Sequence, residues 1–418
     1  MSGGWDAVVV GARVAGAATA LLLARAGRKV LLIDRAAFPS DTMSTLFIHQ
    51  PGVAKLSEWG VLPALLDSGC PVLDTISYEV GGVRLAAPAP VMPGAPAAFA
   101  PRRRVLDQLL VDAAVKAGVE FVDRANLQEL VHSDGRVTGV RFRTATGVRT
   151  EHARLVVGAD GMRSRVAQLV DAPLEVSDPR ASCVYYTAWT GISTGFGFHE
   201  SPGNWIVRIP THDDLTLIST YFPQDRFAEV KQDPFRHHLA AVRSTAPELY
   251  QQVCEADQVE AIIGTGDQQN YFRRGHGPGW VLVGDAGHHL DTISARGITN
   301  ALLQAAFLAE ELAVETADPA RLDAALARFT RRRDEELTEP YQSTLELARL
   351  TVTPSRLEML RTIAASPELT GRYFAVVAGM LGIDELFDDD ALFDDDALFD
   401  DFDDAEGDLG DLDREVQS

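Results

Sequence analysis

Residues 6–35 contain the feature that most constrains the fold of this chain. An apolar strand at 7–10 leads into a turn of small residues at 11–16, and a helix rich in alanine and leucine follows. A second apolar strand at 30–33 then ends at Asp34. This order of strand, turn, helix, strand and acid is typical of a βαβ unit that binds a dinucleotide. It predicts an α/β protein built on a parallel sheet.

The parts of this unit suit a dinucleotide for physical reasons. The free N–H groups and positive dipole end of the helix can bind a pyrophosphate, and Asp34 can accept hydrogen bonds from ribose hydroxyls. Arg13 stands where the usual G-x-G-x-x-G pattern has its second glycine. Its Cβ must point away from the phosphates, although its charge can still reach them. A parallel-sheet unit without a nucleotide is the less favoured alternative.

Composition excludes nucleic acid as a partner. The 418 residues suffice for two or three domains. The net charge is −22, but Asp384–Ser418 alone holds 17 acidic residues and one arginine. The remainder is only mildly acidic and has no basic stripe, which argues against nucleic-acid binding.

The cysteines and the N-terminal segment predict a cytoplasmic protein. Cys70, Cys183 and Cys254 are far apart, and they form neither a C-x-x-C pair nor a metal-binding set. This indicates reduced structural thiols and no bound metal. The first residues lack the features of a signal peptide. Residues 7–26 are apolar enough for a membrane helix, but the strand–turn–helix interpretation accounts for all of them, so we expect no membrane span.

Beyond the βαβ unit the chain changes character several times. We expect a polar loop at 38–50, a helix at 53–68, strands within 70–99, a helix at 103–117 and short strands that include 137–143 and 155–158. The proline-rich stretch 86–96 cannot be a central strand or a helix, so we expect it to be an exposed excursion. Residues 180–270 are rich in aromatic and β-branched residues, which predicts an antiparallel sheet in a second domain. From Ile298 to about Leu381 the pattern is helical.

The acidic tail repeats Asp-Asp-Asp-Ala-Leu-Phe, which places Phe387, Phe393 and Phe399 six residues apart. The favoured interpretation is a solvated segment without fixed structure. The alternative is a docking segment for a basic partner surface or a neighbouring subunit.

Two further segments each end a strand in glycine and aspartate. Asp160-Gly161 follows the strand at 155–158, and Gly284-Asp285 follows Trp280-Val-Leu-Val. Carboxylates just past strand ends lie where open α/β sheets bind ligands, and Gly297 opens a helix that offers N–H groups to an anion. Either aspartate alone is equally consistent with a helix N-cap.

With these motifs in order, the chain resembles the FAD-dependent monooxygenases of the para-hydroxybenzoate hydroxylase type, together with their geranylgeranyl reductase-like and flavin halogenase relatives. The resemblance covers about 380 residues, all but the acidic tail. It implies a Rossmann-like FAD-binding domain, an antiparallel β-sheet substrate domain and C-terminal helices. The implied segments are FAD-binding at 1–75, 100–180 and 271–320, substrate domain at 76–99 and 181–270, C-terminal helices at 321–383 and the tail at 384–418.

The resemblance also implies which residues bind FAD. The cofactor-binding candidates are Gly11, Arg13, Ala15, Gly16, Asp34, Arg35, Arg103, Asp160, Asp285, Gly297, Ile298 and Asn300. Asp285 would bind the ribityl chain, and Gly297–Asn300 would lie along the pyrimidine edge of the isoalloxazine. This chain departs from the family at Arg13 and at Thr292, where proline is usual.

The implied activity is that of an NAD(P)H-dependent FAD monooxygenase, in which NAD(P)H docks transiently. It would hydroxylate or epoxidise a small aromatic or polyketide-like substrate with dioxygen through a flavin C4a-hydroperoxide. His49 and Gln50 are the catalytic candidates. The substrate-contacting candidates are Tyr185, Tyr186, Trp189, Trp205 and Tyr221, for each of which core packing is the favoured alternative. We leave a homodimer open as the assembly.

Three rival functions remain. A reductase of an alkene or prenyl group would need a long apolar pocket. A halogenase is disfavoured because Val207 replaces the second tryptophan of the W-x-W-x-I-P segment and no lysine lies between residues 56 and 115. A non-catalytic flavin-binding module that docks through its acidic tail is the least favoured.

Overall fold

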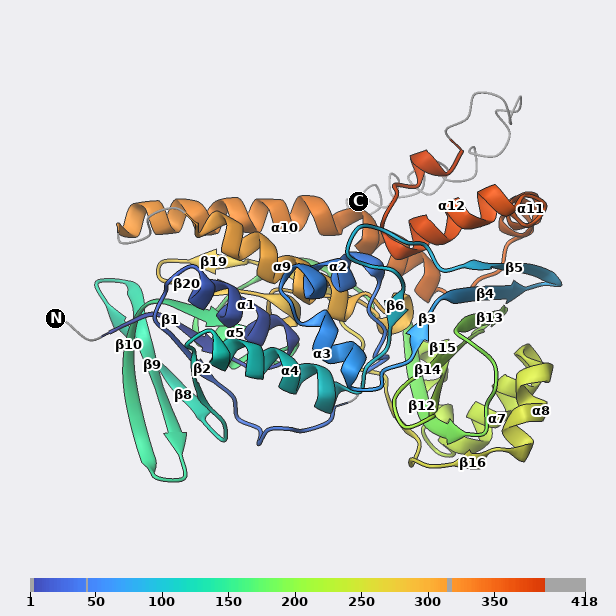
Figure 1. Cartoon of the computed structure of the whole chain (residues 1–418), viewed down its shortest axis with the longest axis horizontal. Coiled ribbons are helices and arrows are strands. Elements are labelled where there is room, and N and C mark those ends of the chain that lie inside the picture. Colours follow the sequence, from blue (N-terminus) through green and yellow to red (C-terminus); the bar gives the residue numbers. More distant parts are fainter. Residues whose placement is uncertain (1–3, 43, 314–317, 388–418) are drawn as a thin grey trace, which may run out of the picture.

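The computed structural model describes residues 4–42, 44–313 and 318–387 (Figure 1). Two large sheets organise the molecule, one on each side of the figure. The first sheet contains, in spatial order, β19 (His276–Gly277), β20 (Trp280–Leu282), β10 (Gly147–Gly158), β1 (Trp5–Val10), β2 (Val30–Ile33) and β7 (Glu120–Val122). The strands from β20 to β7 run parallel. The expected parallel sheet is therefore confirmed.

Alternation along the parallel strands buries both faces of this sheet. Val9 and Leu32 pack against helices on one face, whereas Val8 and Leu31 pack against a β-hairpin and a short helix on the other. The hairpin is β8 (Asn126–Ser133) with β9 (Arg136–Thr144), and the short helix is α5 (Arg165–Leu169). The helical face consists of α1 (Val14–Arg25), α2 (Gln50–Glu58), α3 (Leu62–Asp67), α4 (Arg103–Lys116), α9 (Gly297–Glu311) and α10 (Pro319–Ala348).

The second sheet is antiparallel except for one pair. Its strands are β16 (Asp257–Gln258), β12 (Ser182–Thr190), β15 (Thr216–Pro223), β14 (Asn204–Pro210), β13 (Gly197–Ser201), β4 (Thr75–Val80) and β5 (Val83–Pro88), and β17 (Ile263–Thr265) also pairs with β12. The exception is the pair of β13 and β4, which run parallel. This pair joins two strands that are far apart in the sequence. Two small sheets complete the fold: β11 (Leu174–Asp178) with β18 (Asn270–Arg273) and β21 (His288–His289), and β3 (Val72–Leu73) with β6 (Ala98–Phe99).

Helices cover both faces of the second sheet. The outer face packs against α6 (Phe227–Val230), α7 (Pro234–Thr245) and α8 (Pro247–Glu255), which the sequence analysis did not anticipate within 180–270. The other face packs against α11 (Pro354–Ala364) and α12 (Pro367–Ala378). Single 3-10 turns lie at η1 (Gln224–Arg226), η2 (Gly284–Ala286), η3 (Thr292–Ser294) and η4 (Asp384–Phe387).

Three expectations about local structure were wrong wholly or in part. The helix expected at 53–68 is divided into α2 and α3, because Gly60 adopts φ 67° between them. The proline-rich stretch is largely exposed as expected, and the expectation fails only at Ala89 and Ala95, whose side chains are buried. The tail does not begin at 384, because Leu386 in η4 is fully buried in the core beside the second sheet. Residues 388–418 of the acidic tail lie outside the described residues.

Within the described residues, no helix combines the length and the apolar character that crossing a bilayer requires.

Candidate functional site

In the turn between β1 and α1, backbone atoms lie so close to two of the residues that these residues cannot carry a side chain. Gly11 has φ 101°, and a Cβ there would overlap the carbonyl oxygen of Ala159. A Cβ on Gly16 would overlap the carbonyl oxygen of Gly11. Both positions therefore require glycine. The close packing brings the turn against the end of β10, next to Asp160.

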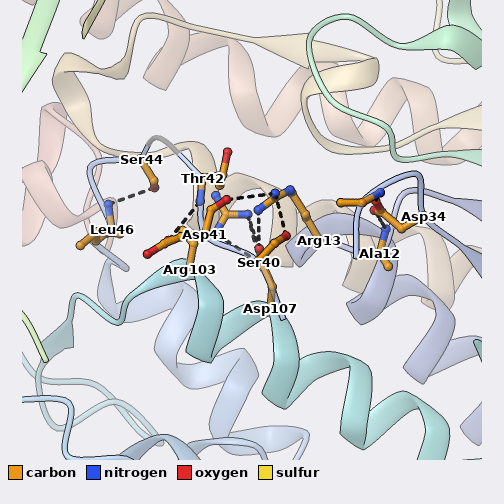
Figure 2. A network of polar contacts seen from close by, with 11 residues as sticks. Ala12, Arg13, Asp34, Ser40, Asp41, Thr42, Ser44, Leu46, Arg103 and Asp107 are labelled. Atoms are coloured by element: carbon orange, nitrogen blue, oxygen red, sulfur yellow. Dashed lines mark hydrogen bonds and ion pairs between the residues drawn. The ribbon is translucent and has the colours of Figure 1, made fainter. Parts of the chain in front are cut away.

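Asp34 at the end of β2 holds this turn in place. Its Oδ2 accepts a hydrogen bond from the Ala12 N–H at 2.7 Å (Figure 2). Its Oδ1 accepts one from the Ala36 N–H at 2.7 Å. The carboxylate is buried and lies against the predicted dinucleotide turn. Arg35, the next residue, is exposed.

Arg13 and Arg103 share one buried carboxylate. Asp107 accepts hydrogen bonds from Arg13 Nη1 at 3.0 Å and from the Arg103 guanidinium at 3.0 to 3.2 Å (Figure 2). Burial raises the pKa of Asp107, and the two guanidiniums oppose that rise. Since two cations meet a single carboxylate, the cluster keeps an excess positive charge beside the turn. Such an excess favours a diphosphate.

The loop between β2 and α2 is bound to this cluster. Arg13 Nη2 lies 3.4 Å from Ser40 Oγ, and Arg102 Nη2 donates to Asp41 Oδ2 at 2.9 Å. Arg102 Nη2 also donates to Glu260 Oε1 at 2.5 Å, so it links the loop to the segment beside the second sheet. The loop is thereby bound to Arg13 and Arg102, which are the N-cap residues of α1 and α4.

Gly284 and Asp285 lie directly against the N-terminal turn of α1. Gly284 has φ 63°, and a Cβ there would lie 2.7 Å from the Cβ of Ala15. Its N–H donates to Gln304 Oε1 at 2.9 Å. The half-buried carboxylate of Asp285 has no hydrogen bond or ion pair with any described residue. Asp285 is therefore available to accept hydrogen bonds from a ligand.

The N-terminus of α9 offers further unpaired groups. No atom lies within 4 Å of the position that a Cβ on Gly297 would take. Asn300 Nδ2 and Gln304 Nε2 are buried without a hydrogen-bond partner among the described residues. Arg296, just before Gly297, donates to the carbonyl of Val377 at 2.9 Å, which ties α9 to the end of α12. The candidate Ile298 is buried in the core beneath this terminus.

Asp160, like Asp34, uses its carboxylate in hydrogen bonds to nearby residues of the protein. It accepts from Ser164 Oγ at 2.5 Å, from the Arg165 N–H at 2.6 Å and from the Val166 N–H at 3.1 Å. Burial raises the pKa of this carboxyl. Asp160 therefore binds the first N–H groups of α5, although the N-cap residue itself is Ser164, whose side chain accepts from the Ala167 N–H.

His49 and Gln50 lie where the two halves of the molecule meet. The His49 N–H donates to Thr299 Oγ1 at 3.0 Å, and its Nε2 donates to the carbonyl of Ser294 at 3.1 Å. Burial and the charge of Arg296 lower the pKa of His49 to about 3, so the imidazole is neutral at physiological pH. Gln50 Nε2 donates to the carbonyl of Pro90 at 2.9 Å.

A small cavity of about 20 Å³ lies beside these two residues. Its walls come from the loop before α2, the second sheet and α12. The lining residues are Phe47, His49, Gln50, Leu73, Ile76, Ala89, Pro90, Ala98, Phe196, Phe198, Phe374, Val377 and Ala378. The rings of Phe47 and Phe196 stack with centroids 4.3 Å apart. Apart from His49 and Gln50, every lining side chain is apolar.

The structure separates the aromatic candidates onto two faces of the second sheet. Tyr185 and Trp189 point to the outer face and pack against α7 and α8. Tyr186, Trp205 and Tyr221 point to the face that also carries Phe47 and Phe196. Tyr221 donates to the carbonyl of Thr292 at 3.0 Å, so it contacts the segment that leads to α9. Consecutive residues along β12 point to alternate faces of the sheet. The sequence alone did not assign the aromatic residues to one face or the other.

Sequence reasoning missed two buried carboxyls. Asp107 lies four residues after Arg103 on one helix face, a spacing that could have revealed the pair. Asp291 accepts hydrogen bonds from Ser182 Oγ at 2.7 Å, Gln268 Nε2 at 3.2 Å and the Ile293 N–H at 3.0 Å. Burial raises the pKa of Asp291 to about 6. It joins the second sheet to η3, and no local pattern announces these distant partners.

These groups fit a flavin dinucleotide. The glycine-lined turn and the excess charge of Arg13 and Arg103 suit a diphosphate, and the unpaired carboxylate of Asp285 suits hydroxyl groups. Asn300 Nδ2 and Gln304 Nε2 lack the partners that buried polar atoms normally have. A polar ligand at the α9 terminus would satisfy them.

Comparison with known families agrees with this geometry. The family model described as FAD binding domain matches residues 5–336. Digeranylgeranylglycerophospholipid reductase 1 of Methanopyrus kandleri is 26% identical over 363 residues, which are 82% of this chain and 89% of that protein. The 6-methylpretetramide 4-monooxygenase of Streptomyces rimosus is 26% identical over 309 residues, or 72% of this chain and 73% of that protein.

Solved structures share the fold. A flavin-dependent brominase superposes with a TM-score of 0.75 at 17% identity, covering 90% of this chain and 94% of its own. A probable FAD-dependent monooxygenase from Pseudomonas aeruginosa gives a TM-score of 0.73 at 19% identity, covering 86% and 99%.

Proposed function

The chain belongs to the FAD-binding domain family and is an FAD-dependent oxidoreductase; from that premise we propose that it is an NAD(P)H-dependent monooxygenase. Its substrate would be a small aromatic or polyketide-like molecule that is hydroxylated or epoxidised. Cofactor, reductant and dioxygen would meet at the carboxyl ends of the parallel strands, beside the apolar cavity.

The residues that would hold FAD follow from the site. Gly11, Gly16 and the pair Arg13 and Arg103 would accommodate the diphosphate, and Asp285 would accept hydrogen bonds from the ribityl hydroxyls. The α9 terminus with Asn300 would face the ring. When bound, FAD supplies hydride acceptance and dioxygen activation. The protein has to orient the substrate and exclude water.

The observation that carries the proposal is the composition of the cavity. Four phenylalanine rings, Phe47, Phe196, Phe198 and Phe374, line a compact space enclosed by the second sheet and α12. Aromatic rings favour flat apolar partners through stacking and edge contacts. Because the cavity of about 20 Å³ is too small to enclose a whole ring, these walls would contact one edge of an aromatic substrate.

The electrostatics of the cavity also favour oxygenation over alkene reduction. Saturating an alkene by hydride transfer requires a proton donor at the second carbon. The polar lining groups are His49, whose pKa of about 3 leaves it neutral, and the amide of Gln50. Neither is a strong acid, and His49 already donates its Nε2 proton to Ser294.

A reductase of an alkene or prenyl group is the second candidate. It is supported by the reductase relatives, of which the Methanopyrus kandleri protein aligns over 82% of this chain. Under this alternative the apolar walls of the cavity would hold part of a hydrocarbon chain.

Two measurements test the proposal. The purified protein is expected to be yellow and to hold FAD noncovalently, and a colourless protein that does not bind added FAD would contradict both candidates. Reduced enzyme is then mixed with ¹⁸O₂ and a panel of aromatic substrates in a stopped-flow instrument. Incorporation of ¹⁸O into the product supports a monooxygenase. Formation of a saturated product from an alkene without oxygen would establish the reductase instead.

A further inference from the structure

A groove on the outer face of the second sheet has the features of a docking site. It lies between α7 and α8, at the lower right of Figure 1, and has a volume of about 700 Å³. The lining residues are Asp233, Phe235, Arg236, Leu239, Ala240, Arg243, Ser244 and Tyr250. This volume is enough for several side chains of a bound segment.

Charge and apolar surface alternate along the groove. Arg236 and Arg243 are exposed and form no ion pair with any described residue. They are seven residues apart on α7, so they share one face about 10 Å apart along the axis. The half-buried Leu239 lies between them, next to Ala240. The groove has one carboxylate, Asp233, and that side chain caps the N-terminus of α7.

The chain itself contains a segment with the complementary pattern. In the tail, Leu392-Phe393 and Leu398-Phe399 are each flanked by runs of aspartate. Asp390 and Asp394 are four residues apart, which spans up to roughly 13 Å in an extended chain. The order in the tail is an acidic residue, an apolar pair and a second acidic residue. This order and its spacing match the order in the groove, where an apolar patch lies between two arginines.

The first copy of this pattern already docks on the protein. Leu386 in Asp-Glu-Leu-Phe is fully buried, and Phe387 packs on the same apolar cluster. From Phe387 the remaining 31 residues can extend by up to about 100 Å. This reach exceeds the diameter of a domain of this size, so the tail can reach the groove.

We propose that the acidic repeat of residues 388–404 docks in the groove between α7 and α8, with its Leu-Phe pairs on Leu239 and Tyr250 and its aspartates on Arg236 and Arg243. The ion pairs are exposed, so salt weakens the contact. Docking removes the exposed apolar lining of the groove from solvent.

The full-length chain offers a direct test through its own thiols. Cys254 is exposed on α8, four residues after Tyr250, whereas Cys70 and Cys183 are buried. A second thiol is introduced as Ala391→Cys within the repeat, or as Gly410→Cys beyond it. Oxidised glutathione is added as the oxidant, and the rate of disulfide formation with Cys254 is followed by mass spectrometry of the cross-linked peptides. Docking raises the local concentration of the first thiol relative to the second.

We expect Ala391→Cys to cross-link at least tenfold faster than Gly410→Cys at low salt. Adding Arg236→Glu and Arg243→Glu should remove this difference, whereas Arg321→Glu, a charge reversal at an exposed arginine on α10, should preserve it. The reaction of Cys254 with a small disulfide corrects for changes in its own reactivity. Monomeric cross-links place the tail on its own chain, and dimeric ones place it on a second copy.

Two results would overturn the proposal. One is equal cross-linking rates for Ala391→Cys and Gly410→Cys in the otherwise unaltered chain. The other is a fast rate that persists after both groove arginines are reversed. Circular dichroism and FAD content show whether each variant is folded.

Discussion

The proposed active site has a cofactor side, which is lined by backbone atoms, and a cavity side, which is lined by aromatic side chains. On the cofactor side, backbone atoms of Gly11, Gly16 and Ala159 approach so closely that side chains have no room. On the cavity side, rings such as Phe47 and Phe196 fill the space between the loop before α2 and the second sheet. A backbone-lined surface tolerates no change of residue, whereas a ring-lined wall can change its shape with its side chains. Under the proposed function, cofactor binding and substrate selection would therefore be separated in the fold.

The strongest test of the backbone-lined side is Gly16→Ala. The added Cβ would overlap the carbonyl oxygen of Gly11, so we expect loss of FAD binding and a large loss of stability. Gly371→Ala on α12 is the matched control, because no atom lies within 4 Å of its Cβ position. Absorbance of bound flavin and thermal unfolding report both effects. A folded, yellow Gly16→Ala protein would show that the turn can relax.

A truncation series tests the core beneath the ring-lined side. A chain that ends at Ile383 loses the fully buried Leu386, and we expect it to lose about 2–5 kcal/mol in free energy of unfolding. A chain that ends at Phe387 keeps this contact and should be more stable than the chain that ends at Ile383 by this amount. Chemical denaturation of the three proteins measures the difference. Equal stability of both truncated chains would mean that η4 contributes nothing.

Asp291 links the second sheet to η3, and its titration should change the free energy of unfolding of the protein. Its pKa of about 6 is raised above the ordinary value near 4. A raised pKa stabilises the folded state below pH 4, and this stabilisation is lost as the pH rises through 6. Relative to Asp291→Asn, the wild type should therefore lose roughly 3 kcal/mol between pH 4 and 7. Parallel stability curves for the two proteins would contradict the assignment.

Phe196→Ala should affect the substrate and leave the cofactor in place. Removing the ring that stacks on Phe47 should cost roughly 1.5–3 kcal/mol of substrate binding, or about tenfold or more in KM. FAD affinity should be unchanged. If Tyr185→Phe on the outer face raised KM instead, the assignment of the substrate to the inner face would be wrong.

Asp285→Ala should weaken the binding of FAD, whereas Phe196→Ala should weaken only the binding of substrate. It removes an acceptor for ligand hydroxyls, which is worth roughly 1.5–3 kcal/mol, so FAD should bind about ten- to a hundredfold more weakly. Because the carboxylate has no partner among the described residues, the stability of the protein without FAD should change little. Titration of FAD and unfolding of the FAD-free protein separate the two effects. Unchanged FAD affinity would remove Asp285 from the proposed site.

The two sides also differ in how far the sequence predicted them. Val30–Ile33 was expected as a strand and is β2, and the helix expected at 103–117 is α4, Arg103–Lys116. Both follow from local periodicity, which is a property of neighbouring residues. The three helices at 227–255 were missed because the aromatic-rich strands around them dominated the pattern of that region.

The sequence by itself determined the α/β class, the dinucleotide turn and the acid at the end of β2. Each depends on residues within about 30 positions, where backbone geometry and small side chains leave few alternatives. Only the tertiary structure decided that Arg13, which is 94 residues before Asp107 in the chain, joins Arg103 on the Asp107 carboxylate. It also decided which face of β12 each aromatic residue occupies. These features depend on contacts between distant segments, whose partners no local pattern specifies.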